Sequence, residues 1–316
     1  MECTAVFRFL LIGCLSLWGI SAHAQVQILT SIKPLQLIAA AIQTNQGEPQ
    51  VLLPPGASPH YFVLRPSDAK RLDKADLFYW IGPDLENFLP RLLSQRSQLS
   101  IAIQDLPELQ LQYFAEPPHE HHADEHSKEH AEDLVEHDHA HQPGAIDVHL
   151  WLLPHNARVI AQRMSADLSA LDPNNASHYA ANLQAFNQRL DRLDQQLKAQ
   201  LKPLQDKSFF VFHEAFNYFE QAYGLQHAGV FALSSELQPG AKHVSQMRTR
   251  LQQAGPSCVF SEPPIQPRLA HTLADGLPVT LAELDALGTK APVNAEGYEQ
   301  LLKNLAEQFS SCLSGL

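Results

Sequence analysis

The sequence has little positive charge, few cysteines and no long apolar run after its first 24 residues. Lys and Arg number 22 against 34 Asp and Glu, which gives a net charge of -12. This balance argues against a nucleic-acid partner, because phosphate binding needs a basic face. The same sign argues against docking on anionic lipid. Charged residues make up only 18% of the chain, below the usual share of about 25%.

The chain is long, and it is rich in proline and histidine. Its 316 residues are too many for one typical domain of about 100–200 residues and fit two. Hydrophobic residues make up 45%, which is enough apolar material for real cores. The 17 histidines stand beside only 4 cysteines and 3 methionines, which is an unusual excess of imidazole.

The first 24 residues have the pattern of a secretory signal peptide. Arg8 ends a short n-region, Phe9 to Ile20 is mostly apolar, and Ala22-His23-Ala24 is a small-x-small cleavage site. The apolar run is too short for a bilayer span, which takes about 20 residues. We expect cleavage after Ala24 and export to the periplasm. An alternative is a lipobox at Leu11-Ile12-Gly13-Cys14, which would leave Cys14 lipidated.

Two cysteines, Cys258 and Cys312, remain in the expected mature chain. In an oxidising compartment an even pair of cysteines predicts a disulfide. It would tie a strand at 258–260 to the carboxy-terminal helix. The alternative is a pair of unrelated buried thiols.

Short apolar runs alternate with helical patterns along the mature chain. Strands are predicted near 26–30, 51–53, 77–81, 208–212, 230–233, 258–261 and 279–284. Helices are predicted near 34–42, 66–74, 148–171, 246–253 and 298–313. Such alternation favours an α/β fold with parallel sheets covered by helices.

Residues 172–203 are predicted to form one long helix between two α/β halves. Apolar residues recur at steps of three and four from Tyr179 to Leu201, and Pro203 ends the pattern. About 25 residues at 1.5 Å each make a rod of about 37 Å, long enough to span both halves. We therefore divide the chain into a signal peptide (1–24), an amino-terminal lobe (25–171), a linker helix (172–203) and a carboxy-terminal lobe (204–316).

Residues 116–141 differ in kind from the rest. They contain eight histidines, nine carboxylates and one lysine, with almost nothing to bury. We expect a mobile, acidic loop that binds metal weakly. The alternative is a solvated tract whose histidines only buffer. The histidines are His119, His121, His122, His126, His130, His137, His139 and His141.

Three further histidines follow turns or strand ends. His60 follows a Pro- and Gly-rich turn, His149 follows the segment 144–148, and His213 follows an apolar strand. The carboxyl ends of parallel strands are where α/β folds bind ligands. Three imidazoles and one carboxylate suit zinc, with Asp285 as the first candidate for the fourth ligand and Glu262 as the second. Taken alone, each of these residues is more often structural.

A series of short segments, read in chain order, resembles the substrate-binding proteins of high-affinity zinc-uptake ABC transporters, the ZnuA type. The resemblance covers essentially the whole mature chain. The segments are Gly56–His60, Leu64–Asp68, Ile81–Pro83, the histidine-rich segment, Asp147–Leu152, Phe212–Phe216, Gln238–Ala241, Phe260–Pro263 and Leu284–Thr289.

This resemblance implies two parallel-sheet α/β lobes joined by one long rigid helix, with the metal in the cleft between the lobes. The family's ligands map to His60 and His149 in the first lobe, and to His213 and Asp285 in the second. Manganese-binding relatives carry glutamate in place of His213, and a nitrogen ligand there favours zinc. The chain departs from the pattern at Pro59, where some members have glutamate, and at Tyr61-Phe62, where Asp-Tyr is common.

The function implied is capture of Zn²⁺ and its delivery to an inner-membrane ABC permease and, through it, the ATPase. The protein would act as a monomer and would catalyse no reaction, and Zn²⁺ would be its transported ligand. The alternatives are a manganese receptor of the same fold, a periplasmic zinc buffer or chaperone without a permease, and a secreted zinc hydrolase. The hydrolase alternative is weakened by the lack of a His-Glu-x-x-His pair.

Overall fold

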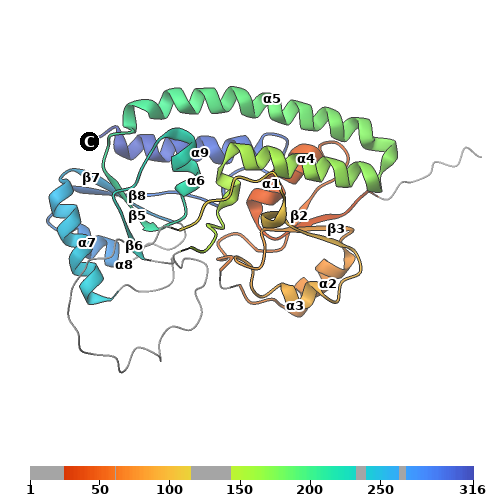
Figure 1. Ribbon diagram of the computed structural model, residues 1–316, viewed down its shortest axis with the longest axis horizontal. Helices are drawn as coiled ribbons and strands as arrows, with labels where there is room; N and C mark the ends of the chain where they lie inside the picture. The colour runs from red at the N-terminus through yellow and green to blue at the C-terminus, as the bar shows by residue number, and fades with distance from the viewer. Residues whose placement is uncertain (1–24, 61, 115–143, 233–239, 263–267) are drawn as a thin grey trace, which may run out of the picture.

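Two α/β halves lie side by side beneath one long helix (Figure 1). The structure, a computed structural model, describes residues 25–60, 62–114, 144–232, 240–262 and 268–316. The predicted signal peptide and the histidine-rich segment 116–141 lie outside the described residues. None of the described helices combines the length and the apolar character that crossing a membrane requires.

The amino-terminal half is built on a parallel sheet with strand order β2-β1-β3-β4. Its strands are β1 Ile28–Thr30, β2 Gln50–Val51, β3 Leu77–Trp80 and β4 Leu99–Ala102. Its helices are α1 Lys33–Ile42, α2 Pro66–Lys74, α3 Pro90–Leu93 and α4 Pro154–Leu171, with 3-10 turns η1 Ile103–Asp105 and η3 Leu150–Leu152. Every residue of β1 and β3 is buried, as expected of central strands in a covered parallel sheet.

The carboxy-terminal half repeats this topology. Its parallel sheet has the order β6-β5-β7-β8, so the first two strands are exchanged as in the first sheet. The strands are β5 Phe209–His213, β6 Gly229–Ala232, β7 Ser257–Ser261 and β8 Val279–Glu283. The helices are α6 Asn217–Tyr223, α7 Ala241–Ala254, α8 Arg268–Ala274 and α9 Gly297–Leu313. Each half therefore has an edge of strand ends at which a ligand can be held.

The predicted long helix is present as α5 Ala176–Leu201, preceded by the 3-10 turn η4 Pro173–Asn175 and followed by η5 Lys202–Leu204. Its 26 residues span about 39 Å, and it runs across the top of both halves (Figure 1). The predicted apolar stripe is its buried face, formed by Tyr179, Phe186, Leu190, Leu193, Leu197 and Leu201. The lobe boundaries that we placed on either side of it stay predictions.

The helix α9 is a second connection between the halves, which the sequence analysis did not anticipate. It follows the last strand of the second sheet and packs against both α1 and α5. At its first residue a Cβ on Gly297 would lie 2.2 Å from the Pro292 carbonyl oxygen and 2.8 Å from Leu37 of α1. Arg189 of α5 donates to the buried Glu299 carboxylate at 2.6 Å. A layer of helices, rather than a single linker, therefore limits how far the halves can move apart.

Some element boundaries differ from the sequence expectations. The helix predicted over 148–171 begins only at Pro154, because proline favours the first helical position, and residues 150–152 form a 3-10 turn instead. The helix α7 is longer than predicted, and β4, α3, α6 and α8 were missed. Strand β4 lies at the sheet edge, where Leu99 is exposed and only Ile101 is buried, so its pattern was weak.

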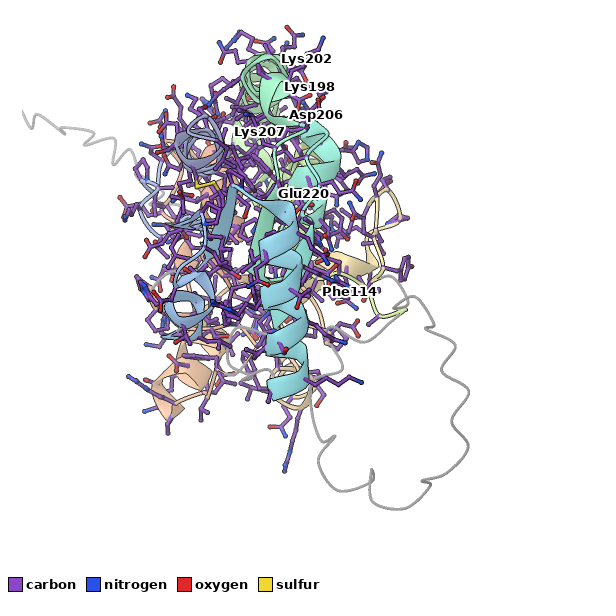
Figure 2. The ribbon with its side chains drawn as sticks, turned by 90° about the vertical axis from the view of Figure 1, so that its left-hand side faces the viewer. Phe114, Lys198, Lys202, Asp206, Lys207 and Glu220 are labelled. Carbon is purple, nitrogen blue, oxygen red and sulfur yellow. A yellow bond between two sulfur atoms is a disulfide. The ribbon has the colours of Figure 1, made fainter. Side chains whose placement is uncertain are left out.

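The predicted disulfide is confirmed. Cys258 of β7 and Cys312 of α9 are bonded, with their Cα atoms 6.2 Å apart (Figure 2). The bond closes a loop between residues 54 apart in the sequence. In the chain-entropy account, a loop of this size contributes about 4 kcal/mol to stability. The bond anchors the bridging helix α9 to its own sheet.

A buried carboxyl group, that of Glu86, lies at the carboxyl end of β3. Its two oxygens accept hydrogen bonds from the backbone N–H groups of Ile81 (3.3 Å) and Gly82 (3.0 Å). Complete burial raises the pKa of Glu86 to about 7, although these bonds and Ser31 oppose the shift. The folded protein therefore binds a proton that the unfolded chain has already lost at mildly acidic pH.

The raised pKa of Glu86 predicts that this residue lowers stability as pH rises. Its contribution is most favourable below the unfolded pKa and is lost progressively as pH rises toward the folded value of about 7. Between about pH 5 and about pH 8 we expect wild type to lose about 2 kcal/mol of unfolding free energy relative to Glu86→Gln. Urea titrations of both proteins at the two pH values measure this, and an unchanged difference would contradict it.

Candidate metal centre

Three histidines from distant parts of the chain meet at one point. One ring nitrogen from each of His60, His149 and His213 lies within 4.8 Å of the others. The ring centroids are 5.1 to 5.8 Å apart. All three residues are buried, at 8%, 2% and 4% exposure. Among the described residues this is the one group of three or more His, Cys, Asp or Glu side chains close enough to hold a metal ion.

The two halves each contribute to the group. His213 is the last residue of β5, whose five residues are all buried, so its place is fixed by the second sheet. His60 lies in the segment between β2 and α2 of the first half, and His149 directly precedes η3. The structure thus brings together the three histidines that the sequence analysis selected.

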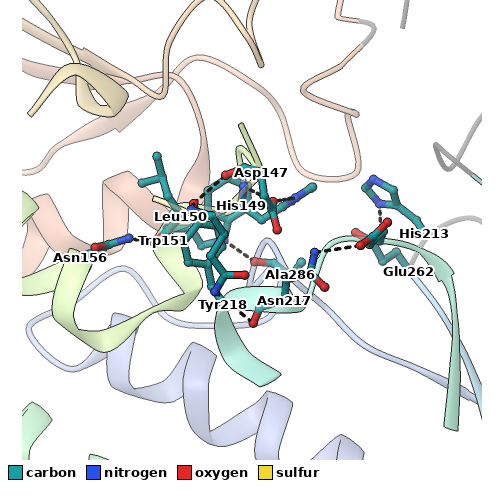
Figure 3. A network of polar contacts seen from close by, with 12 residues as sticks. Asp147, His149, Leu150, Trp151, Asn156, His213, Asn217, Tyr218, Glu262 and Ala286 are labelled. Carbon is teal, nitrogen blue, oxygen red and sulfur yellow. Dashed lines mark hydrogen bonds and ion pairs between the residues drawn. The ribbon is translucent and has the colours of Figure 1, made fainter. Parts of the chain in front are cut away.

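Two carboxylates lie behind two of the rings (Figure 3). Asp147 Oδ1 is 2.8 Å from Nδ1 of His149 and also accepts from the His149 backbone N–H at 3.0 Å. Glu262 Oε1 is 2.5 Å from Nδ1 of His213. Because an ionised carboxylate can only accept, Nδ1 is the donor, and in the neutral form of the ring this leaves the Nε2 lone pair for a metal ion. In metal sites, a carboxylate that accepts from the non-ligating ring N–H of a histidine orients that imidazole toward the metal in this way.

The sequence analysis missed these two orienting roles. Glu262 was considered only as a metal ligand. Its carboxylate instead contacts Nδ1 of His213, the ring nitrogen that would face away from a metal ion bound at Nε2. Its position after β7, the neighbour of β5 in the sheet, could have indicated this contact. Asp147 lies two residues before His149, a spacing that lets one side chain bind both the ring and the backbone of that histidine.

Asp285 is not part of the group of three histidines in this structure. Its Oδ2 atom accepts from the backbone N–H of Thr289 at 2.7 Å and from the Thr289 hydroxyl at 2.6 Å. Lys33 of α1 donates to the Thr289 carbonyl at 2.7 Å. Burial lowers the pKa of Lys33, and the charge of Asp285 opposes that shift. The carboxylate thus stabilises a turn, and its role as fourth ligand stays a prediction.

The donor set fits Zn²⁺. Three neutral imidazoles with an open fourth position form a common zinc environment. Nitrogen donors favour zinc over manganese, which prefers carboxylate and water oxygens. Trp151 packs beside the centre, with its ring 5.4 Å from that of His149 and its Nε1 donating to the Ala286 carbonyl at 2.9 Å. An indole so close to a ligand provides a fluorescent reporter of binding.

Two α/β halves that bring three histidines close enough to hold a metal ion have the architecture of a two-lobed, metal-binding solute-binding protein. The chain belongs to the family described as zinc-uptake complex component A, periplasmic, whose sequence model matches residues 28–312. It is 38% identical over 295 residues to the high-affinity zinc uptake system protein ZnuA of Yersinia pestis, with 92% of each chain covered.

Solved structures agree with the fold. A crystal structure of ZnuA matches with a TM-score of 0.72 at 24% identity, over 92% of this chain and 100% of that one. The solute-binding protein FpvC of Pseudomonas aeruginosa, in complex with Mn²⁺, matches with a TM-score of 0.74 at 18% identity, over 92% and 99%. At such identities the likeness concerns the fold alone, so the choice of metal has to be argued from the donor atoms.

The contact between Asp147 and His149 predicts that Asp147→Asn weakens metal binding without unfolding the protein. The variant keeps an acceptor for the Nδ1 proton but loses the negative charge that makes the imidazole more basic. Loss of such a partner typically costs about 10–100-fold in metal affinity. Competition titration of Zn²⁺ against a chromophoric chelator measures the change.

Asp191→Asn is a suitable control for this experiment. Asp191 forms a surface ion pair with Arg158 and is 64% exposed. Its replacement is expected to leave zinc affinity unchanged. Equal affinity in wild type and Asp147→Asn would show that the carboxylate does not support the centre.

Proposed function

We propose that this chain is the periplasmic protein that captures Zn²⁺ and delivers it to an inner-membrane ABC permease with its ATPase. The observation that carries the proposal is the meeting of three buried imidazoles from both halves at one point. Membership of the zinc-uptake family supports the same conclusion. The protein acts as a monomer, is exported by residues 1–24 and is cleaved after Ala24.

Capture exchanges water for protein ligands and breaks no covalent bond. The ion gives up most of its hydration shell to the Nε2 atoms of His60, His149 and His213. Binding weakens as pH falls, because a protonated imidazole cannot ligate a metal. Release requires only a small separation of the halves, since His213 belongs to one half and the other two histidines to the other.

Asp285 is the proposed fourth ligand. Its neighbour Ala286 accepts a hydrogen bond from Trp151, which packs on His149, so the aspartate lies in the segment that adjoins the centre. Ligation would require its carboxylate to exchange the Thr289 contacts for the ion. We expect its removal to cost less affinity than removal of any of the three histidines.

Manganese is the second candidate metal, because a protein of this fold is known in complex with Mn²⁺. The three nitrogen donors favour zinc instead. Competition between the two metals for one site separates these candidates. Tighter retention of manganese than of zinc would replace the proposal with that of a manganese receptor.

The histidine cluster predicts that each of His60→Ala, His149→Ala and His213→Ala loses tight zinc binding. Removing one of three donors from a buried site is expected to lower affinity by about 100-fold or more. Equilibrium dialysis with Trp151 fluorescence as a second readout measures it. His155→Ala is the control, since its ring contacts the Glu108 carbonyl outside the cluster. Tight zinc retention by the triple variant would overturn the proposal.

We propose further that the histidines of residues 116–141 bind additional zinc weakly and gather the ion for the main centre. Deleting residues 116–141 is expected to lower the number of bound ions while leaving one tight site. Calorimetric titration of the full and the shortened chains gives both stoichiometry and affinity. Loss of the tight site on deletion would refute this division of labour.

A further inference from the structure

Two short segments pair antiparallel just before the metal centre. Tyr113 and Ile146 form an antiparallel bridge between residues 112–114 and 144–147. The Phe114 N–H donates to the Ala145 carbonyl at 3.0 Å, and the Asp147 N–H donates to the Gln112 carbonyl at 2.8 Å. A regular antiparallel pair would also have a direct bond from the Gln112 N–H to the Asp147 carbonyl.

The hydroxyl of Tyr218 takes the place of that direct bond. It accepts from the Gln112 N–H at 2.9 Å. It donates to the carbonyl of Asp147 at 2.8 Å, and Tyr218 and Asp147 are both labelled in Figure 3. Tyr218 belongs to α6 of the carboxy-terminal half and is fully buried. A side chain of one half therefore completes a backbone ladder of the other.

The ladder that Tyr218 completes is the support of His149. Asp147 holds Tyr218 through its backbone carbonyl, and through its side chain it holds both the ring and the backbone N–H of His149. At the other end, Tyr218 is the second residue of α6, the helix that follows directly after β5, and His213 is the last residue of β5. The side chain of Gln112 adds a second contact to α6, donating to Gln221 Oε1 at 2.5 Å.

We infer that Tyr218 is a positioning residue for zinc capture, which sets the placement of His149 relative to His213. This inference rests on the proposed function, because it concerns the same centre. His149 and His213 come from different halves, so their Nε2 atoms converge only if the two halves are held in a fixed relative position. Side chains locked by such supporting bonds give a site its pre-organised geometry. Burial also raises the pKa of Tyr218, so its hydroxyl keeps the donated proton at neutral pH.

Tyr218→Phe tests this role in the full chain, because it removes the hydroxyl and keeps the packing of the ring. We expect zinc to dissociate about tenfold faster or more, because the change removes both the bond from the Gln112 N–H and the bond to the Asp147 carbonyl, with unchanged stoichiometry. Stopped-flow mixing with excess chelator measures the rate. Tyr223→Phe is the matched control, a buried tyrosine on the same helix whose hydroxyl lies outside the Gln112–Asp147 pair. It is expected to leave the rate unchanged.

A spectroscopic readout separates positioning from general stabilisation. Co²⁺ bound in place of zinc has visible absorption bands that depend on ligand geometry, and these are expected to shift in Tyr218→Phe but not in Tyr223→Phe. Tyr218→4-aminophenylalanine keeps a donor toward Asp147 and is expected to restore the bands and the slow dissociation. Rescue of this kind would not follow if the residue only filled space.

The outcomes distinguish the two levels of the proposal. An unchanged dissociation rate and cobalt spectrum in Tyr218→Phe, while His149→Ala loses zinc, would overturn the role of Tyr218 and leave the proposed function standing. A lower unfolding temperature with unchanged metal release from the folded protein would also overturn it, because the role would then be structural. Tight zinc retention by His149→Ala would instead contradict the proposed function itself.

Discussion

The metal centre depends on holding the lone pairs of three imidazoles at one point, although the histidines come from two halves that are built on separate sheets. Each imidazole has two nitrogens and can rotate, so proximity alone does not make a site. The carboxylates of Asp147 and Glu262 remove that freedom for His149 and His213 by accepting from Nδ1. Burial of the rings adds to the effect, because a carboxylate contact is stronger where water is excluded. The centre is thus defined as much by these acceptors as by the ligands.

Contacts between the halves extend this constraint beyond the centre. Trp151 donates to the Ala286 carbonyl at 2.9 Å, and Tyr298 of α9 donates to the Trp151 carbonyl at 2.7 Å. Both bonds join the turn that follows His149 to the carboxy-terminal half. Together with the packing of α9 on α1 and α5, they argue for small movements on binding rather than wide opening. A site whose donors are divided between halves needs only such a small movement to release its ion.

The sequence predicts those features that leave a local pattern. The apolar stripe of α5 and the buried run that ends at His213 are each visible within a short stretch of sequence. The disulfide follows from counting, because two cysteines remain after the predicted signal peptide. Strand β4 leaves a weaker trace because it is short and lies at the sheet edge, where only Ile101 is buried. Tyr218 leaves none, since its hydroxyl meets Gln112 across 106 positions of sequence. Asp285 could be selected by pattern, but which partner its carboxylate takes depends on the fold of the Thr289 turn.

The fold does not by itself choose the metal. A protein with the same architecture occurs in complex with Mn²⁺, so the preference has to come from the atoms that face the ion. At position 213 the chain offers an imidazole, and Glu262 lies behind that ring, not in the ligand group of three histidines. With an imidazole at position 213 and the Glu262 carboxylate on the Nδ1 side of that ring, the three donors of the group are all nitrogen atoms. Selectivity of this kind is achieved by ligand type, and it requires no change in the two sheets or in the helices that join them.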